Sequence, residues 1–356
     1  MVGFYSIEIV YYAIGANFQS KNRILALILD FYFASIVITC LLWVGMNVKF
    51  MTEEESWKEI YFLVTFWTPL DFFQLIATIF MRRNCVKHQQ FMEEAVKTMT
   101  EKNKIRLKRT STVFATVIIV FAATKCGYHV RELRNSLQDK NYVFASLFIL
   151  LIVSFIAYFW MSYVNILTAF FIRSASLYEQ SFLHRLHEQI RKNKVSLSTC
   201  TIAVQRVSDF KHRSVTQMGL MPLFGFAILF SMVTFLVITT AESNNNAVHN
   251  IYSTIILLTF LVTCIVADRA VATSARKCDA ITAIILQKEE KKWLPLIESL
   301  HKLSSEQYTM NGLFTINIRL FFAFLSAVVA FGALVSQMMN TTSASGGADT
   351  HNNSTN

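Results

Sequence analysis

Seven long apolar runs, separated by charged stretches, constrain this chain more than any other feature. They cover residues 24–48, 60–81, 112–128, 142–172, 217–240, 250–267 and 312–338. A bilayer core about 30 Å thick is crossed by roughly 20 helical residues, and an open chain can pair its backbone polar groups inside lipid only as helices. The sequence therefore predicts an all-α transmembrane fold, a seven-helix bundle.

The lysines and arginines between these runs predict the orientation of the bundle. Alternate segments, starting with the amino-terminal one, hold 26 of the 33 basic residues, whereas the segments of the other set hold 5. Short loops rich in Lys and Arg stay on the cytosolic side. We therefore expect a cytosolic amino terminus and an extracellular carboxyl terminus. The net charge of +10 is explained by this pattern and by anionic lipid heads, without nucleic acid.

Three regions are predicted along the chain. Residues 1–23 form a cytosolic segment that lacks the features of a cleaved signal peptide, and residues 24–338 form the membrane domain. Residues 339–356 form a disordered extracellular tail, which carries glycosylation sequons at Asn340, Asn352 and Asn353. A polar tail also generates such sequons by chance. None of the six cysteines lies in a predicted outer loop, so we expect no structural disulfide.

The same features argue against other seven-helix classes. G-protein-coupled receptors have an extracellular amino terminus, and this chain lacks Asn-Pro-x-x-Tyr in its last run and Asp-Arg-Tyr after its third. Seven-helix hydrolases need zinc held by histidines within the membrane, whereas all eight histidines here lie in loops, at loop edges or in the tail. We expect no enzyme, metal or cofactor. Two alternatives stay open. One is a G-protein-coupled receptor, which the topology would decide, and the other is a transporter, although three prolines and no visible repeat do not favour it.

The last apolar run resembles the insect gustatory receptor family. That family carries Gly-x-Phe-x-aliphatic-Asp at the start of its seventh helix and ends the helix with Thr-Tyr, five apolar residues and Gln-Phe. Gly312, Phe314, Ile316 and Gln337 match in order. The departures from the pattern are Asn317 for the acid, Ala330 and Phe331 for Thr-Tyr, and Met338 for Phe.

The resemblance implies a ligand-gated, non-selective cation channel at the plasma membrane of sensory neurons, opened by a small-molecule tastant. It slightly favours a bitter tastant over a sugar. It further implies a homo- or heterotetramer of related subunits, in which the seventh helix of each subunit lines the pore. Insect odorant receptors share this architecture but usually have longer chains.

Carried over from the family pattern, the expected pore-lining residues are Ala330, Leu334, Gln337 and Met338. A ring of four Gln337 amides can hydrate an ion, and an apolar ring beside it can close the path by dewetting. The alternative for Gln337 is a glutamine wetted by head-group water.

Candidate ligand-binding residues lie in the second and fourth runs. Asp71 is an acid within a predicted span, close to Trp67, and a charge in lipid indicates a functional site. Tyr158, Trp160 and Tyr163 offer rings on which small molecules stack. The alternatives are a structural ion pair for Asp71 and packing in the aromatic belt for the others.

Two basic inner segments are predicted to contain cytosolic helices that pack between subunits or lie on the membrane surface. They are the start of 173–215 and residues 284–303. In the first, Glu179, Arg185, Glu188 and Arg191 are expected on the polar face. Asp30 and Arg319 are expected at the interface or paired with each other.

Overall fold

A computed structural model describes the following residues: 10, 24, 26–28, 30–34, 37–38, 41, 68–137, 144–192, 196–218, 222–223, 225–227, 229–230, 233–234, 247–287 and 293–346. Within them the chain is almost entirely helical. The helices are α4 (Thr68–Thr98), α5 (Glu101–Leu137), α6 (Phe144–Arg191), α7 (Leu197–Met218), α9 (Ala247–Leu286), α10 (Leu294–Ser305) and α11 (Ile318–Gly346), and the short strands β1 (Thr309–Met310) and β2 (Phe314–Thr315) precede α11.

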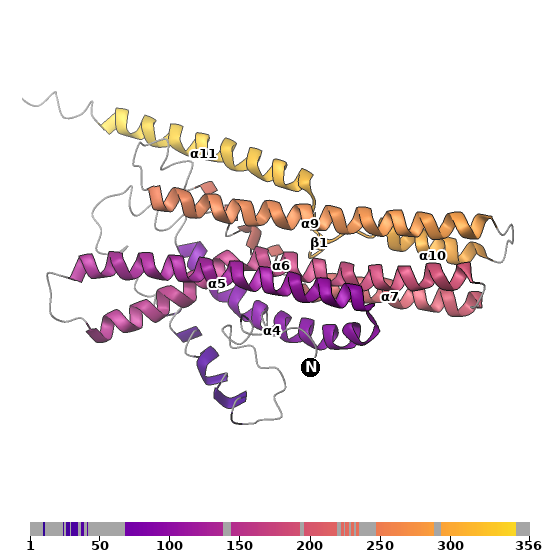
Figure 1. Cartoon of the computed structure of the whole chain (residues 1–356). Coiled ribbons are helices and arrows are strands. Elements are labelled where there is room, and N and C mark those ends of the chain that lie inside the picture. The colour runs from indigo at the N-terminus through magenta and orange to yellow at the C-terminus, as the bar shows by residue number, and fades with distance from the viewer. Residues whose placement is uncertain are drawn as a thin grey trace, which may run out of the picture.

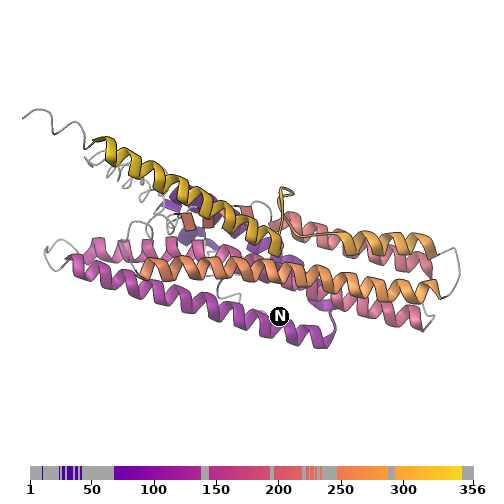
Figure 2. The same cartoon turned by 90° about the horizontal axis from the view of Figure 1, so that it is seen from above.

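The basic segments expected as inner loops are largely helical extensions of the predicted spans. The third run lies inside α5 and the sixth inside α9, while α6 contains the fourth run from Phe144 onward. Each of these helices continues into its flanking basic segment. Figures 1 and 2 show the result, an elongated bundle in which α6 and α9 run side by side along most of its length.

At one end of the molecule, the C-terminal parts of α6 and α9 pack against α7 and α10, on the right in Figure 1. We call this part the four-helix bundle. Its core is formed by Leu183, Leu186, Ile190, Cys200, Val204, Val207, Cys278, Ile281, Ile285, Trp293, Leu296, Leu300 and Leu303. The predicted helix over 284–303 is therefore two helices, since α9 ends at Leu286 and α10 begins at Leu294, with Pro295 in its first turn.

The remainder of the bundle, which contains the described parts of the predicted spans, we call the spanning region. Two described helical segments, Thr254–Leu286 and Ile318–Val335, are by length and composition able to cross a membrane. The fifth run approaches α6 closely, because a Cβ on Gly225 would lie 2.7 Å from Val164 Cγ1. Most of the first run and residues 60–67 of the second lie outside the described residues.

The start of the last helix differs from the prediction. Gly312 does not open a span but lies in the turn of the β1–β2 hairpin, where Asn311 and Gly312 have φ of 51° and 77°. Asn and Gly tolerate positive φ best, so this dipeptide favours a hairpin turn rather than a helix. Helix α11 begins six residues after Gly312, at Ile318, and it extends to Gly346, into the segment expected to be disordered.

Candidate functional site

The face of α11 that carries the predicted pore residues is exposed. Ala330, Leu334 and Gln337 are exposed, Leu334 to 53%, and their spacing places them on one side of the helix. Met338 lies on the same helix, and its side chain is outside the described residues. The opposite side buries Phe321, Phe324, Val328 and Val335. One side of α11 is therefore buried and the other is exposed, although both sides are mainly apolar.

Aromatic side chains hold the first half of α11 against its neighbours. The Phe324 ring lies 5.1 Å from that of Phe226 and 5.4 Å from that of Phe260, in edge-to-face geometry. Further along the helix, Phe331 lies 5.8 Å from Phe230. Such pairs contribute about 0.5–1.5 kcal/mol each beyond their burial.

The amino terminus of α11 is capped twice. The Ile318 amide donates to Asp268 Oδ2 at 2.9 Å, and the Leu320 amide donates to Asn317 Oδ1 at 2.8 Å. Asn caps a helix about as well as Asp, so the Asn317 side chain suits this position. Asp268 belongs to α9, and its carboxylate also complements the positive end of the helix dipole.

The hairpin before α11 rests on a buried charged cluster in the four-helix bundle. Lys211 Nζ lies 3.9 Å from Glu179 Oε1, donates to the Leu303 carbonyl at 3.2 Å and lies 5.6 Å from the Tyr308 ring centroid. Ser274 donates a hydrogen bond to Glu179. Burial raises the pKa of the Glu179 carboxyl, and Lys211 and Ser274 oppose that shift. This cluster joins α6, α7, α9 and α10 to Tyr308, which directly precedes β1.

The prediction that Glu179 lies on a polar face is wrong. Glu179 is 3% exposed and Lys211 is 2% exposed. Residues 173–181 of α6 are surrounded by α4, α5, α7 and α9, so positions that look polar in the sequence face other helices. Sequence periodicity shows only that a helix has two faces. It does not show that both are covered.

A buried histidine joins α4 to α6. The His88 ring stacks on Phe171 at 3.9 Å between centroids, and its Nε2 lies 2.8 Å from Ser174 Oγ. Because the Ser174 hydroxyl already donates to the Phe171 carbonyl, Nε2 of His88 carries the proton and donates. Burial lowers the pKa of His88 to about 3, so the ring is neutral.

The predicted ligand residues that the structure describes lie on α4 and α6. Asp71 lies in the first turn of α4, and Tyr158, Trp160 and Tyr163 lie on α6, but the side chains of all four are outside the described residues, as is Trp67 altogether. Asp30 and Arg319 were expected at the interface or paired with each other. Asp30 forms an ion pair with Arg82 instead, and Arg319 is exposed.

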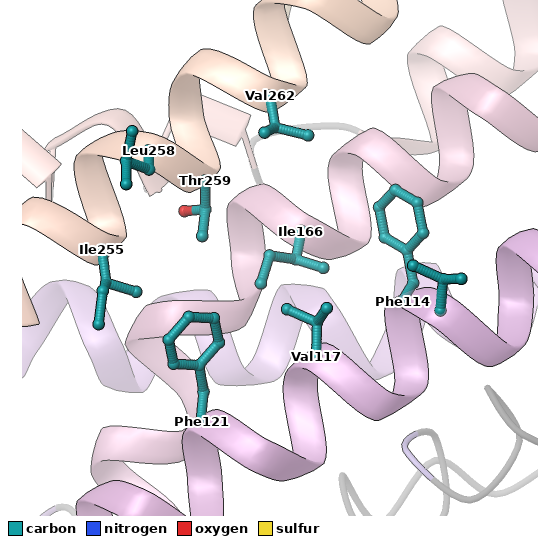
Figure 3. Close-up of a pocket in the computed structure, with 9 residues that line it drawn as sticks. Phe114, Val117, Phe121, Ile166, Ile255, Leu258, Thr259 and Val262 are labelled. Atoms are coloured by element: carbon teal, nitrogen blue, oxygen red, sulfur yellow. The ribbon is translucent and has the colours of Figure 1, made fainter.

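A cavity of about 280 Å³ lies between α5, α6 and α9 (Figure 3). Its lining is formed by Val113, Phe114, Val117, Phe121, Ile166, Ile255, Leu258, Thr259 and Val262. Among the described lining residues only Thr259 has a polar side chain, and its hydroxyl donates to the Ile256 carbonyl at 2.7 Å. The cavity therefore suits an apolar occupant. No sequence pattern indicated it, since hydrophobic residues on three distant segments carry no local signal.

The arrangement of these helices matches a solved receptor. Over 94% of its length the chain superposes on 97% of the insect olfactory receptor OR5 from Machilis hrabei, solved in complex with eugenol, with a TM-score of 0.68. The fold is that of an insect olfactory receptor. The two sequences share 11% identity, so the olfactory-receptor fold is preserved while most of its side chains differ. No family model and no curated protein sequence matches the chain.

The predicted all-α chemoreceptor fold is confirmed by this match. The architecture expected for a gustatory receptor is shared with insect odorant receptors, so the choice between the gustatory and the olfactory branch stays a prediction. The roles of the pore-lining and ligand-binding residues also stay predictions.

Proposed function

We propose that this protein is a chemoreceptor of the gustatory branch, a cation channel in the plasma membrane that opens when a small molecule binds. The observation that carries the proposal is the match to an insect olfactory receptor over 94% of the chain. The uncovered face of α11 supports it, because a pore helix has to leave one face free of its own chain.

The proposed channel is a tetramer, with Ala330, Leu334, Gln337 and Met338 facing the central path. An isolated copy of α11 cannot enclose a pore, and its exposed Phe322, Val329 and Leu334 need either lipid or neighbouring subunits. The amino terminus is cytosolic and the carboxyl terminus extracellular in this proposal. Asp71, Trp67, Tyr158, Trp160 and Tyr163 are proposed to contact the ligand from the outer part of the bundle.

Charge substitutions at Gln337 test the pore directly. Four glutamates in one ring concentrate cations, and four lysines repel them. We expect Gln337→Glu to raise and Gln337→Lys to lower single-channel cation conductance in patches from cells that express the receptor. Asp279→Lys, an exposed position on α9, serves as the control. Unchanged conductance in both Gln337 variants would exclude the pore role.

Odorant reception is the second candidate, favoured by the identity of the matched structure. The matched receptor was solved with eugenol, a small aromatic odorant. Recording currents during application of soluble bitter compounds and sugars, and then of volatile aromatics, distinguishes the branches. Responses to volatiles alone would assign the chain to the olfactory branch.

A further inference from the structure

The cavity between α5, α6 and α9 opens toward the surface of the bundle. Four of its lining side chains are strongly exposed, namely Val113 at 60%, Val117 at 37%, Leu258 at 53% and Val262 at 47%. Figure 3 shows Val117 and Phe121 on α5 facing Ile166 on α6, with Ile255 and Val262 on α9 across the gap. An apolar groove that opens sideways between predicted spans faces lipid chains.

Each of the three helices that line the groove carries an arginine two turns from a lining residue, toward the four-helix bundle. Arg106 precedes Val113 by seven residues on α5, Arg173 follows Ile166 by seven on α6, and Arg269 follows Val262 by seven on α9. Seven residues return to nearly the same helix face about 10.5 Å along the axis. The three arginines therefore lie at the end of the groove nearest the four-helix bundle, on the helix faces that line it.

The electrostatics of Arg173 show that these arginines lie near one another. Burial lowers the pKa of Arg173, and Arg106 and Arg269 lower it further. Burial also lowers the pKa of Lys277, Arg106 and Lys102 lower it further, and Glu179 opposes these shifts. No ion pair joins Arg106, Arg173 or Arg269 to a carboxylate within the described ranges of the chain. Arg173 is partly buried beside the exposed Arg106 and Arg269, so an anion bound there would be stabilised by all three charges.

We propose that this groove and the three arginines form a binding site for an anionic phospholipid of the cytosolic leaflet. One acyl chain occupies the groove, and the head-group phosphate contacts Arg106, Arg173 and Arg269. The arginines lie on the basic side of the protein, which faces the leaflet that holds the anionic lipids. Guanidinium groups bind phosphate oxygens through paired hydrogen bonds. The site goes beyond the proposed channel activity and does not depend on it.

Binding of defined lipids to the purified receptor in detergent tests the proposal. Native mass spectrometry is used to compare dioleoyl phosphatidylserine with dioleoyl phosphatidylcholine, which has the same acyl chains. We expect the wild-type protein to prefer the anionic lipid by about tenfold or more. Replacing all three arginines by Gln should abolish the preference, and the Arg173→Lys variant should retain most of it.

Two controls distinguish binding at this specific site from general attraction of lipid by positive charge. The variant Lys97→Gln/Arg191→Gln/Arg206→Gln removes the same charge from exposed positions on other surfaces and should keep the preference. In the groove, Val117→Trp should weaken binding of both lipids, whereas Val120→Trp, exposed on the same helix and absent from the lining, should not. Thermal unfolding and gel filtration establish that each variant is folded.

Three results would overturn the proposal. Equal binding of the two lipids would mean that the groove takes any apolar chain. An equal loss of preference in the control charge variant would mean a diffuse electrostatic effect. Displacement of the anionic lipid by inorganic phosphate alone, with no effect of Val117→Trp, would mean a phosphate site without a lipid chain.

Discussion

The two ends of the molecule use apolar residues differently. In the four-helix bundle, Leu186, Leu296 and Leu300 are 2% exposed or less, because four helices of one chain surround them. In the spanning region, α11 exposes Phe322 to 59% and Leu334 to 53% although its sequence is more apolar. One end therefore buries its apolar residues within a single chain, whereas the other leaves apolar side chains exposed, which the proposed channel would cover with lipid and further subunits. The following predictions test that contrast.

The largest effect is expected at the buried ion pair. Lys211→Met leaves the Glu179 carboxylate buried beside Ser274 without its cation, which should cost about 3–5 kcal/mol of stability. Adding Glu179→Gln should restore much of that loss. Thermal unfolding in detergent measures both, and Lys192→Met, which breaks the exposed pair with Glu188 at 3.4 Å, should cost under about 1 kcal/mol. Similar losses for Lys192→Met and Lys211→Met would contradict the buried cluster.

A matched pair of leucine truncations compares the two ends directly. Leu300→Ala leaves a cavity in the four-helix bundle and should cost about 2–5 kcal/mol. Leu334→Ala removes a side chain that is 53% exposed and should change the unfolding midpoint little, within about 0.5 kcal/mol. Its effect should fall on the channel current instead. Equal destabilisation by the two would show that subunit packing buries Leu334.

Acid should weaken the contact between α4 and α6 through His88. The folded-state pKa of about 3 lies below the unfolded value of 6.5, so the unfolded chain takes up the proton first. Stability is then complete above pH 6.5 and falls as the pH drops toward 3, by about 2 kcal/mol at pH 5.

In unfolding experiments at pH 7 and pH 5, His88→Gln should remove most of this dependence. His184→Gln, at an exposed position, should leave it unchanged. Equal pH dependence in wild type and His88→Gln would assign the acid sensitivity to another group.

The smallest effect is expected at the cap of α11. Asp268→Ala removes the acceptor for the Ile318 amide and should cost about 1 kcal/mol, while Asp268→Asn should cost less. Hydrogen exchange of the amides at the start of α11 should accelerate in the Asp268→Ala variant. It should not accelerate in Asp279→Ala, which changes an exposed acid on α9, the helix that also carries Asp268. Unchanged exchange would mean that Asn317 alone caps the helix.

The sequence predicted the helical class, the approximate positions of the spans and the helices of the inner segments. It failed where a residue's environment depends on a distant segment. Glu179 has the same spacing as a surface residue, and only the packing of α7 and α9 shows that it is buried. Asp268 looks like an isolated interfacial acid until the start of α11 is placed beside it.

At Gly312 the prediction failed for a different reason. The resemblance to a family motif predicts the start of a helix there, whereas the Asn311-Gly312 dipeptide by itself indicates a turn. The pore positions rest on the resemblance and on exposure, and the ligand positions rest on an acid and aromatic residues within two predicted spans. No local pattern distinguishes a residue that faces a pore from one that faces lipid.

The double cap of α11 determines where that helix can move. Its first turn is tied to α9 through Asp268 and to the hairpin through the bond from the Ile316 amide to the Tyr308 carbonyl, 2.8 Å long. The last buried side chain described on the helix is that of Val335, and beyond it Gln337 is exposed. A tilt of the helix therefore pivots at Ile318, and its sideways displacement grows with distance from that hinge. In the proposed tetramer Gln337 lies far from this pivot, so a small rotation at the base of α11 would be converted into a larger change in the aperture between the Gln337 side chains.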